Sequence, residues 1–153
     1  MSTLFLAFLI GVVAGLRALT PLAAVSWAAR LGWLDLHGSW LSFFGFAAVP
    51  YIFTVLAVAE LIADKLPKTP SRKAAPSFIV RIVSGGLCGA ALGMAGDALI
   101  GGLVAGVLGA VAGTFGGYEL RTRLVKVIGG NDLPIALLED AIAIIAAIWI
   151  VSQ

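Results

Sequence analysis

Apolar runs of about twenty residues follow one another along the whole chain, and no other feature restricts its fold so strongly. A helix of that length crosses the hydrocarbon core of a bilayer, which is roughly 30 Å thick. Inside that core every backbone amide and carbonyl needs a partner within the protein, and a helix supplies these partners within a single segment. The sequence therefore predicts an all-α integral membrane protein.

The apolar runs predict a bundle of about five short transmembrane helices. We place these spans in a single transmembrane domain over residues 1–153, at about 3–25, 41–63, 78–96, 98–118 and 134–151. A soluble domain is excluded because 12% of the residues are charged, about half the share usual in soluble proteins. No Lys or Arg precedes the first run, so we expect an uncleaved span and not a signal peptide.

The basic residues indicate an orientation. The stretch after the second segment carries four cations that could hold lipid headgroups: Lys65, Lys68, Arg72 and Lys73. Three more follow the fourth segment: Arg121, Arg123 and Lys126. Five spans put both stretches on one side, which the positive-inside rule makes cytoplasmic. We therefore expect a cytoplasmic N-terminus, membrane lipids as partners and no nucleic acid, since the cations lie at the ends of apolar segments.

Small residues fill the third and fourth segments. Gly85, Gly89 and Gly93 recur every four residues, which puts them on one helix face. The fourth segment continues the pattern with Gly102, Gly106, Gly109, Gly113, Gly116 and Gly117. Such faces allow close packing of helices within the chain or within a homo-oligomer. The alternative is that some glycines open a helix for function, around 15–21 and 113–117.

The first segment carries its own interruption in the sequence GLRALTPLAAV. Thr20 is a suitable N-cap, and Pro21 suits the first position of a new helix. This predicts a non-helical stretch over Gly15–Leu19 that contains Arg17, although a proline kink with Arg17 reaching the interface is the simpler alternative. Residues 10–32 resemble residues 108–129, and with five spans the two copies would form an inverted repeat, as in many secondary transporters.

Charged residues inside or next to the spans are the candidate binding residues, because a charge in hydrocarbon normally faces a partner or water. These are Arg17, Thr20 (as a polar neighbour), Glu60, Asp64, Arg81, Glu119, Glu139 and Asp140. All the charges except Arg17 are expected towards the cytoplasmic side. One alternative is a structural ion-pair network of Arg81 and Arg121 with Glu60 and Glu139. The other is a site for an ion or an anionic headgroup. The sequence contains no catalytic or metal motif, so we expect no enzyme, metal or cofactor.

Three stretches carry a resemblance to a known family: GLRALTPLAAVSWAARLGWL, ELIADKLPKTPSR and AGTFGGYELRTRL. The chain resembles, over nearly its whole length, the bacterial integral membrane proteins grouped as domain-of-unknown-function family 4126. The resemblance implies a bacterial inner-membrane protein and transfers no activity.

Two functions remain from the sequence. The interruption, the repeat and the charges inside the spans favour a small transporter or channel-like protein for an ion or small solute. The alternative is a non-transporting structural or lipid-binding protein that oligomerises through its glycine-rich faces. Whether Arg17 and Glu60 line a wet cavity or form buried ion pairs distinguishes the two.

Overall fold

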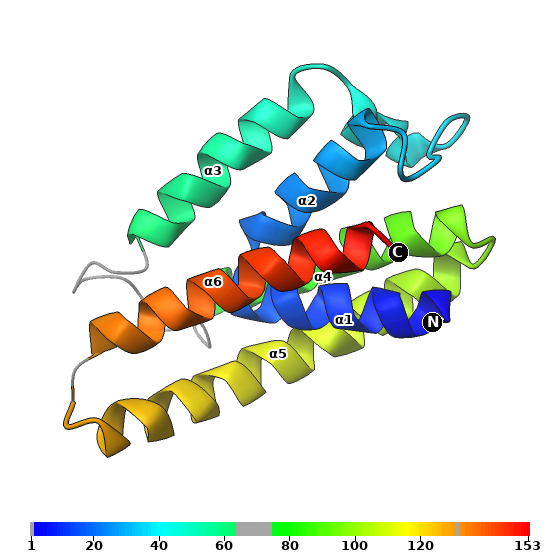
Figure 1. The fold of residues 1–153 in the computed structure, drawn as a ribbon. Coiled ribbons are helices and arrows are strands. Elements are labelled where there is room, and N and C mark those ends of the chain that lie inside the picture. Colours follow the sequence, from blue (N-terminus) through cyan, green and yellow to red (C-terminus); the bar gives the residue numbers. More distant parts are fainter. Residues whose placement is uncertain (1, 64–74, 131) are drawn as a thin grey trace.

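The computed structural model describes residues 2–63, 75–130 and 132–153, and these residues are almost entirely helical (Figure 1). The elements are α1 (Thr3–Leu16), α2 (Leu19–Arg30), the short 3-10 helix η1 (Trp40–Gly45), α3 (Val49–Ala63), α4 (Ala75–Ala95), α5 (Leu99–Val127) and α6 (Asp132–Val151). The described part of the chain contains no strand, which confirms the predicted all-α fold.

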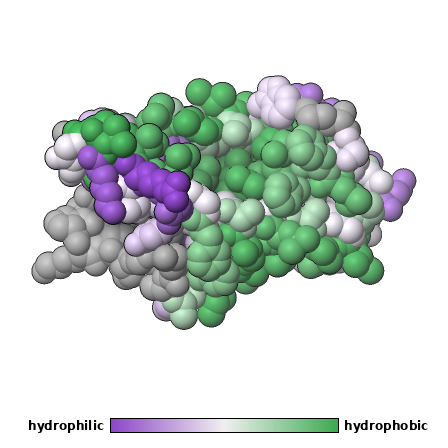
Figure 2. Space-filling model, turned by 90° about the horizontal axis from the view of Figure 1, so that it is seen from below, coloured by the Kyte–Doolittle hydropathy of each residue, from purple (hydrophilic) through white to green (hydrophobic). Residues whose placement is uncertain are grey.

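Three helices are long and apolar enough to cross a membrane. They are α4, α5 and α6, with 21, 29 and 20 residues, which at 1.5 Å per residue is about 30 Å or more each. The apolar helices α1 and α3 are shorter, with 14 and 15 residues. Figure 2 shows hydrophobic side chains over most of one face, with hydrophilic side chains gathered towards the ends of the molecule. The chain is a helical membrane protein.

The first apolar segment is interrupted, as the sequence predicts. Helix α1 ends at Leu16, Arg17 adopts an extended conformation (φ −142°, ψ 111°), and α2 begins at Leu19. Pro21 explains the position, because in a continuous helix its ring would collide with the carbonyl of Arg17, four residues earlier. The break is narrower than Gly15–Leu19. Thr20 is not its N-cap: Ala18 holds that position and supplies no side-chain hydrogen bond.

The chain turns back at this break, so the expected single span over 3–25 is wrong. Helix α2 runs back towards the end of the bundle from which α1 came, and the two helices form a V (Figure 1). Both termini therefore lie at one end of the bundle, whereas five full spans would put them at opposite ends. The C-terminal ends of α3 and α5 and the start of α6 lie at the other end (Figure 1).

Two other segments differ from the predicted ranges. The expected span 41–63 begins with η1, and its α-helix starts only at Val49, with Pro50 in the first turn, where a missing N–H costs nothing. The expected span 98–118 continues as α5 to Val127 and does not open around 113–117. Gly113 serves close packing, because a Cβ there would lie 2.2 Å from the Val12 carbonyl oxygen of α1.

The centre of the bundle is a contact of α1, α4 and α5 through residues without side chains. Cβ atoms added to Gly85, Gly89 and Gly93 of α4 would lie 2.7, 2.3 and 2.4 Å from atoms of residues 98–110. Real Cβ atoms do not approach that closely, so the backbones are already in contact. The four-residue spacing of these glycines therefore has the packing role that the sequence predicts.

The predicted inverted repeat is wrong in its direction. Gly11 of α1 faces Gly106 of α5, and Gly15 faces Ala110 and Thr114. Residue numbers thus rise together along the contact, so the two resembling stretches run parallel and not antiparallel. The second copy also lies within the continuous helix α5, whereas the first copy breaks. The physical reason is the turn at Arg17, which reverses α2 relative to the predicted course.

The position of the termini gives a prediction for thiol labelling. We expect Ser2→Cys and Ser152→Cys to react with a membrane-impermeant maleimide from the same side of sealed vesicles. Arg123→Cys, near the end of α5, should react only from the opposite side. The unmutated protein is the control, because its Cys88 is buried and should not react. Labelling of the two termini from opposite sides would contradict the reversal at Arg17.

Candidate functional site at the helix break

The break exposes the first amides of α2, and a residue from a distant helix binds them. The backbone N–H groups of Ala18 and Leu19 donate to the two carboxylate oxygens of Glu60 on α3, at 2.8 and 2.7 Å. The first amides of a helix lack intrahelical partners and carry the positive end of the helix dipole. Glu60 therefore acts as the cap of α2, although it lies about forty residues away along the chain.

Side chains of α4 bind the carbonyl groups at the same break. Arg81 donates from Nη1 to the Gly15 carbonyl oxygen at 2.8 Å. The Ser84 hydroxyl donates to the Ala18 carbonyl oxygen. Both side chains are at least 95% buried, so water does not replace these contacts easily. Residues 81 and 84 are three apart on one helix face, which lets a single face of α4 serve both sides of the break.

Arg17 itself points into the protein and meets the carboxylates of α6. Its Nε and Nη2 lie 2.6 and 2.5 Å from Oδ1 of Asp140, and its Nη1 lies 3.5 Å from Oε1 of Glu139. Arg17 is fully buried, so it does not reach the interface as the simpler alternative expected. Burial of two charges carries a large desolvation cost, which the attraction between the two groups offsets.

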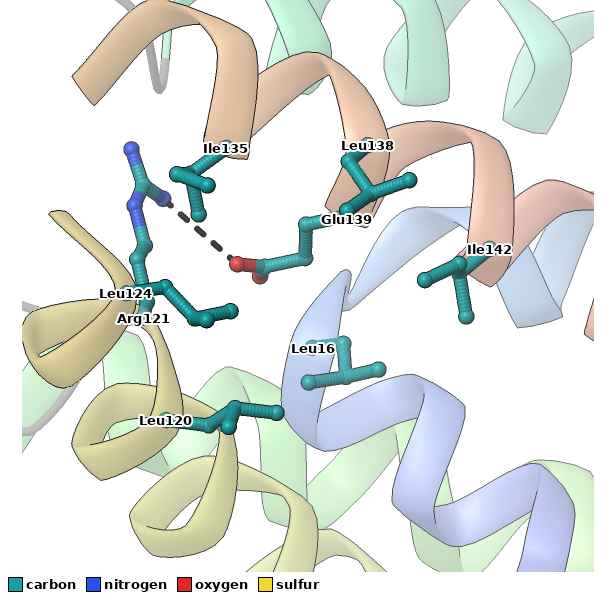
Figure 3. Close-up of a pocket in the computed structure, with 9 residues that line it drawn as sticks. Leu16, Leu120, Arg121, Leu124, Ile135, Leu138, Glu139 and Ile142 are labelled. Atoms are coloured by element: carbon teal, nitrogen blue, oxygen red, sulfur yellow. Dashed lines mark ion pairs between the residues drawn. The ribbon is translucent and has the colours of Figure 1, made fainter. Parts of the chain in front are cut away.

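A small apolar pocket adjoins this ion pair between α5, α6 and the end of α1. Its volume is about 120 Å³, and it is lined mostly by leucine and isoleucine side chains (Figure 3). Glu139 and Arg121 are its charged members, with Nη1 and Oε2 3.8 Å apart. Arg121 also donates two hydrogen bonds to Asp132, at 2.9 and 2.6 Å. Glu139 thus lies between the buried Arg17 and the pocket.

The break brings together five of the predicted binding residues, which we call the break cluster: Arg17, Glu60, Arg81, Glu139 and Asp140. Thr20 lies beside the cluster in the first turn of α2, buried, with a hydroxyl that has no hydrogen-bond partner among the described residues. The expectation that Arg17 lies apart from the other charges is wrong, because α1 ends beside the part of α6 that carries Glu139 and Asp140.

Other predicted residues are elsewhere. Glu119 is exposed on α5 and pairs with Arg123 at 2.9 Å, away from the break. The predicted Arg121–Glu139 pair is present at 3.8 Å. Asp64 and the four expected lipid-binding cations, Lys65, Lys68, Arg72 and Lys73, lie outside the described residues.

Sequence reasoning missed Ser84 and the pairing of Arg17 with Asp140. Ser84 carries a weak signal, since it lies three residues after the intramembrane Arg81 and therefore on the same helix face. Pairing across more than one hundred residues carries no local signal. Thr114, fully buried and without a hydrogen-bond partner among the described residues, was also not singled out.

Fold and site together define an all-helical membrane protein with a charged, side-chain-capped break in its first apolar segment. The chain belongs to the family described as Domain of unknown function (DUF4126), whose family model matches residues 4–152. No curated protein and no solved structure matches the chain.

Proposed function

We propose that the protein is a small inner-membrane transporter or channel-like protein for an ion or small solute, with the break cluster as its binding site. The observation that carries this proposal is the capping of the break. Its amides and carbonyls are bound by side chains of α3 and α4, not by a local cap or by regular helix. Discontinuous helices with freed backbone groups are the usual binding sites of secondary transporters.

The cost of the arrangement supports a functional role. Each charge placed in hydrocarbon costs several kcal/mol, about 3 or more, before it finds a partner. A continuous helix without Arg17 and Pro21 would pack α1 without that cost. Polar side chains that hold backbone groups can be exchanged for polar groups of a solute, whereas intrahelical hydrogen bonds cannot be exchanged in this way.

The burial of Arg17 favours the second candidate, a structural or lipid-binding membrane protein. Arg17 is fully buried in its ion pair with Asp140. If the break cluster is a transport site, this arrangement corresponds to a closed state, in which Arg17 is paired with carboxylates of the protein and not with a solute. As a structural device, it would fix α1 to α6. Membrane lipids, and copies of the same chain, would then be the partners.

The charge distribution supports a revised orientation. Arg121, Arg123 and Lys126 lie near the end of α5 that is opposite to both termini (Figure 1). If this basic end is cytoplasmic, as the positive-inside rule expects, both termini face the other side of a bacterial inner membrane. This proposal replaces the cytoplasmic N-terminus expected from five full spans.

Flux measurements in proteoliposomes test the transport proposal. We expect a gradient-driven flux of a proton, metal cation or small anion, measured with entrapped fluorescent indicators. Glu60→Gln should lower it at least about tenfold, the effect of losing one charged contact worth about 1.4 kcal/mol. The matched control is Glu119→Gln, because Glu119 is exposed and pairs with Arg123 on its own helix. It should leave the flux unchanged.

Two outcomes would contradict the proposal: the absence of flux under every gradient, and a flux that Glu60→Gln does not change. Absence of flux together with retention of co-purified anionic lipid would support the lipid-binding alternative instead.

A further inference from the structure

The amides at the start of α2 form a two-pronged recognition element. Ala18 and Leu19 donate one hydrogen bond each to the two oxygens of one carboxylate, at 2.8 and 2.7 Å. This geometry selects a planar group with two acceptor oxygens, and the dipole of the twelve-residue helix α2 favours a negative charge there. The present occupant, Glu60, belongs to another helix. Ala18 and Leu19 supply two donors but no side-chain acceptor of their own.

An unused donor beside these amides provides a second, independent indication of a ligand. Thr20 in the first turn of α2 is 93% buried, and its hydroxyl has no hydrogen-bond partner among the described residues. Helical Cβ atoms are tilted towards the N-terminus of their helix, so the Thr20 side chain leans towards the break. A buried hydroxyl normally has a partner, and a ligand bound at the amides could supply one.

Glu60 is carried by a peripheral helix. Helix α3 packs mainly on α2 and η1, whereas the centre of the bundle is made by α1, α4 and α5. Most apolar side chains of α3 are exposed, including Tyr51, Val55 and Ile62 (Figure 1 shows α3 at the edge of the bundle). Withdrawal of Glu60 from the amides therefore leaves the central packing in place.

The charges of the break cluster also permit an exchange. Without Glu60, the break cluster holds two guanidinium groups (Arg17 and Arg81) and two carboxylates (Glu139 and Asp140), so its formal charge is zero. The adjoining pair of Arg121 and Asp132 adds no net charge. Glu60 adds one negative charge. A monovalent anion in its place restores the same total, whereas a cation at these amides would face donors and no acceptor.

We propose that the N-terminus of α2 binds a small monocarboxylate, which replaces the Glu60 carboxylate on the amides of Ala18 and Leu19 and accepts a hydrogen bond from Thr20. Use of this site for transport rests on the proposed function, whereas the existence of the site does not. Glu60 is an internal occupant that closes the site when the ligand leaves. Its return to the amides displaces the ligand, so its loss lowers the flux although it leaves the site open to binding.

Chemical rescue of the purified full-length protein in detergent tests the site without any gradient. Potassium formate is titrated against potassium chloride at equal ionic strength, and thermal unfolding is followed. We expect formate to stabilise Glu60→Ala saturably, raising its unfolding temperature by about 4 °C at ten times its Kd. The unmutated protein should shift much less, since its own carboxylate occupies the amides.

Further variants and probes complete the test. Thr20→Val in the Glu60→Ala background should weaken formate binding about fivefold, the loss expected for one neutral hydrogen bond. Glu60→Gln keeps the size of the side chain and is used if Glu60→Ala does not fold without formate. It should shift in the same direction. Inorganic phosphate and vesicles containing phosphatidylglycerol are the competing probes.

The outcomes are distinct. No shift with formate in either variant, or equal shifts in the variants and the unmutated protein, would overturn the site. A larger shift with phosphate or with the lipid vesicles would overturn the carboxylate class. Rescue by formate without any flux would leave the site standing and reject the transport proposal, whereas flux without rescue would do the reverse.

Discussion

Arg17→Met is expected to lower the free energy of unfolding by about 3–5 kcal/mol, which is the usual cost of removing one partner of a buried ion pair. The substitution keeps an unbranched side chain of similar length but leaves Asp140 with a buried charge and no guanidinium at 2.5–2.6 Å. It also removes the Arg17 Nη1 hydrogen bond to the Leu16 carbonyl, one of the last carbonyls of α1. The measurement is reversible unfolding in mixed detergent micelles.

A double substitution separates the effect of the unpaired charge on stability from the effect of the changed side-chain shape. Arg17→Met combined with Asp140→Leu removes both charges, and we expect it to recover most of the lost stability, because apolar replacements of a buried pair are often neutral. The matched control is Arg123→Ala, which breaks the exposed pair with Glu119 and should cost less than about 1 kcal/mol. A loss for Arg17→Met no larger than for Arg123→Ala would show that the pair contributes little to the fold.

The position of the break could be predicted from the sequence, because its cause is local. Pro21 kinks or breaks a helix that runs through Arg17, and that rule needs no knowledge of the rest of the chain. The cap could not be predicted in the same way. Local reasoning favours Thr20, the nearest side chain of the right type, whereas the structure uses Glu60 from another helix. The packing of α3 on α2 therefore determines that a carboxylate from α3, and not the nearby Thr20 hydroxyl, caps the helix.

The direction of the chain after the break also lay beyond the sequence. A kink and a reversal both satisfy Pro21, and hydropathy does not distinguish them, since both keep apolar residues in the bilayer. The five-span prediction follows from treating the interrupted first segment as a single crossing of the membrane. It gave the inverted repeat and the separated termini, both of which the reversal at Arg17 removes. One wrong assumption at one residue therefore accounts for several linked errors.

The glycine pattern was predictable for a different reason. Four-residue spacing fixes a helix face from the sequence alone, and in a membrane such faces form backbone contacts. The structure adds which faces meet: α5 packs on α1 and α4 at once, through different glycines. This three-helix centre is closely packed, whereas α3 lies at the edge of the bundle.

Gly106 lies at the point where all three central helices meet. A Cβ atom on Gly106 would lie 2.1 Å from the Gly85 carbonyl oxygen of α4. On the other side, the Gly106 carbonyl oxygen is 2.2 Å from the position of a Cβ on Gly11 of α1. Helix α5 therefore cannot retreat from α4 without pressing on α1, and a backbone oxygen cannot rotate away as a side chain can.

Gly106→Ala is accordingly expected to destabilise the protein by about 3 kcal/mol, the upper end of the usual cost of overpacking. Alanine is a better helix former than glycine by about 1 kcal/mol, so the expected loss already includes a favourable local effect. The matched control is Gly116→Ala on the same helix, where an added Cβ meets nothing within 4 Å. That substitution should be neutral or slightly stabilising in the same unfolding measurement. Equal effects of the two substitutions would mean that backbone contact at Gly106 does not hold the three helices together.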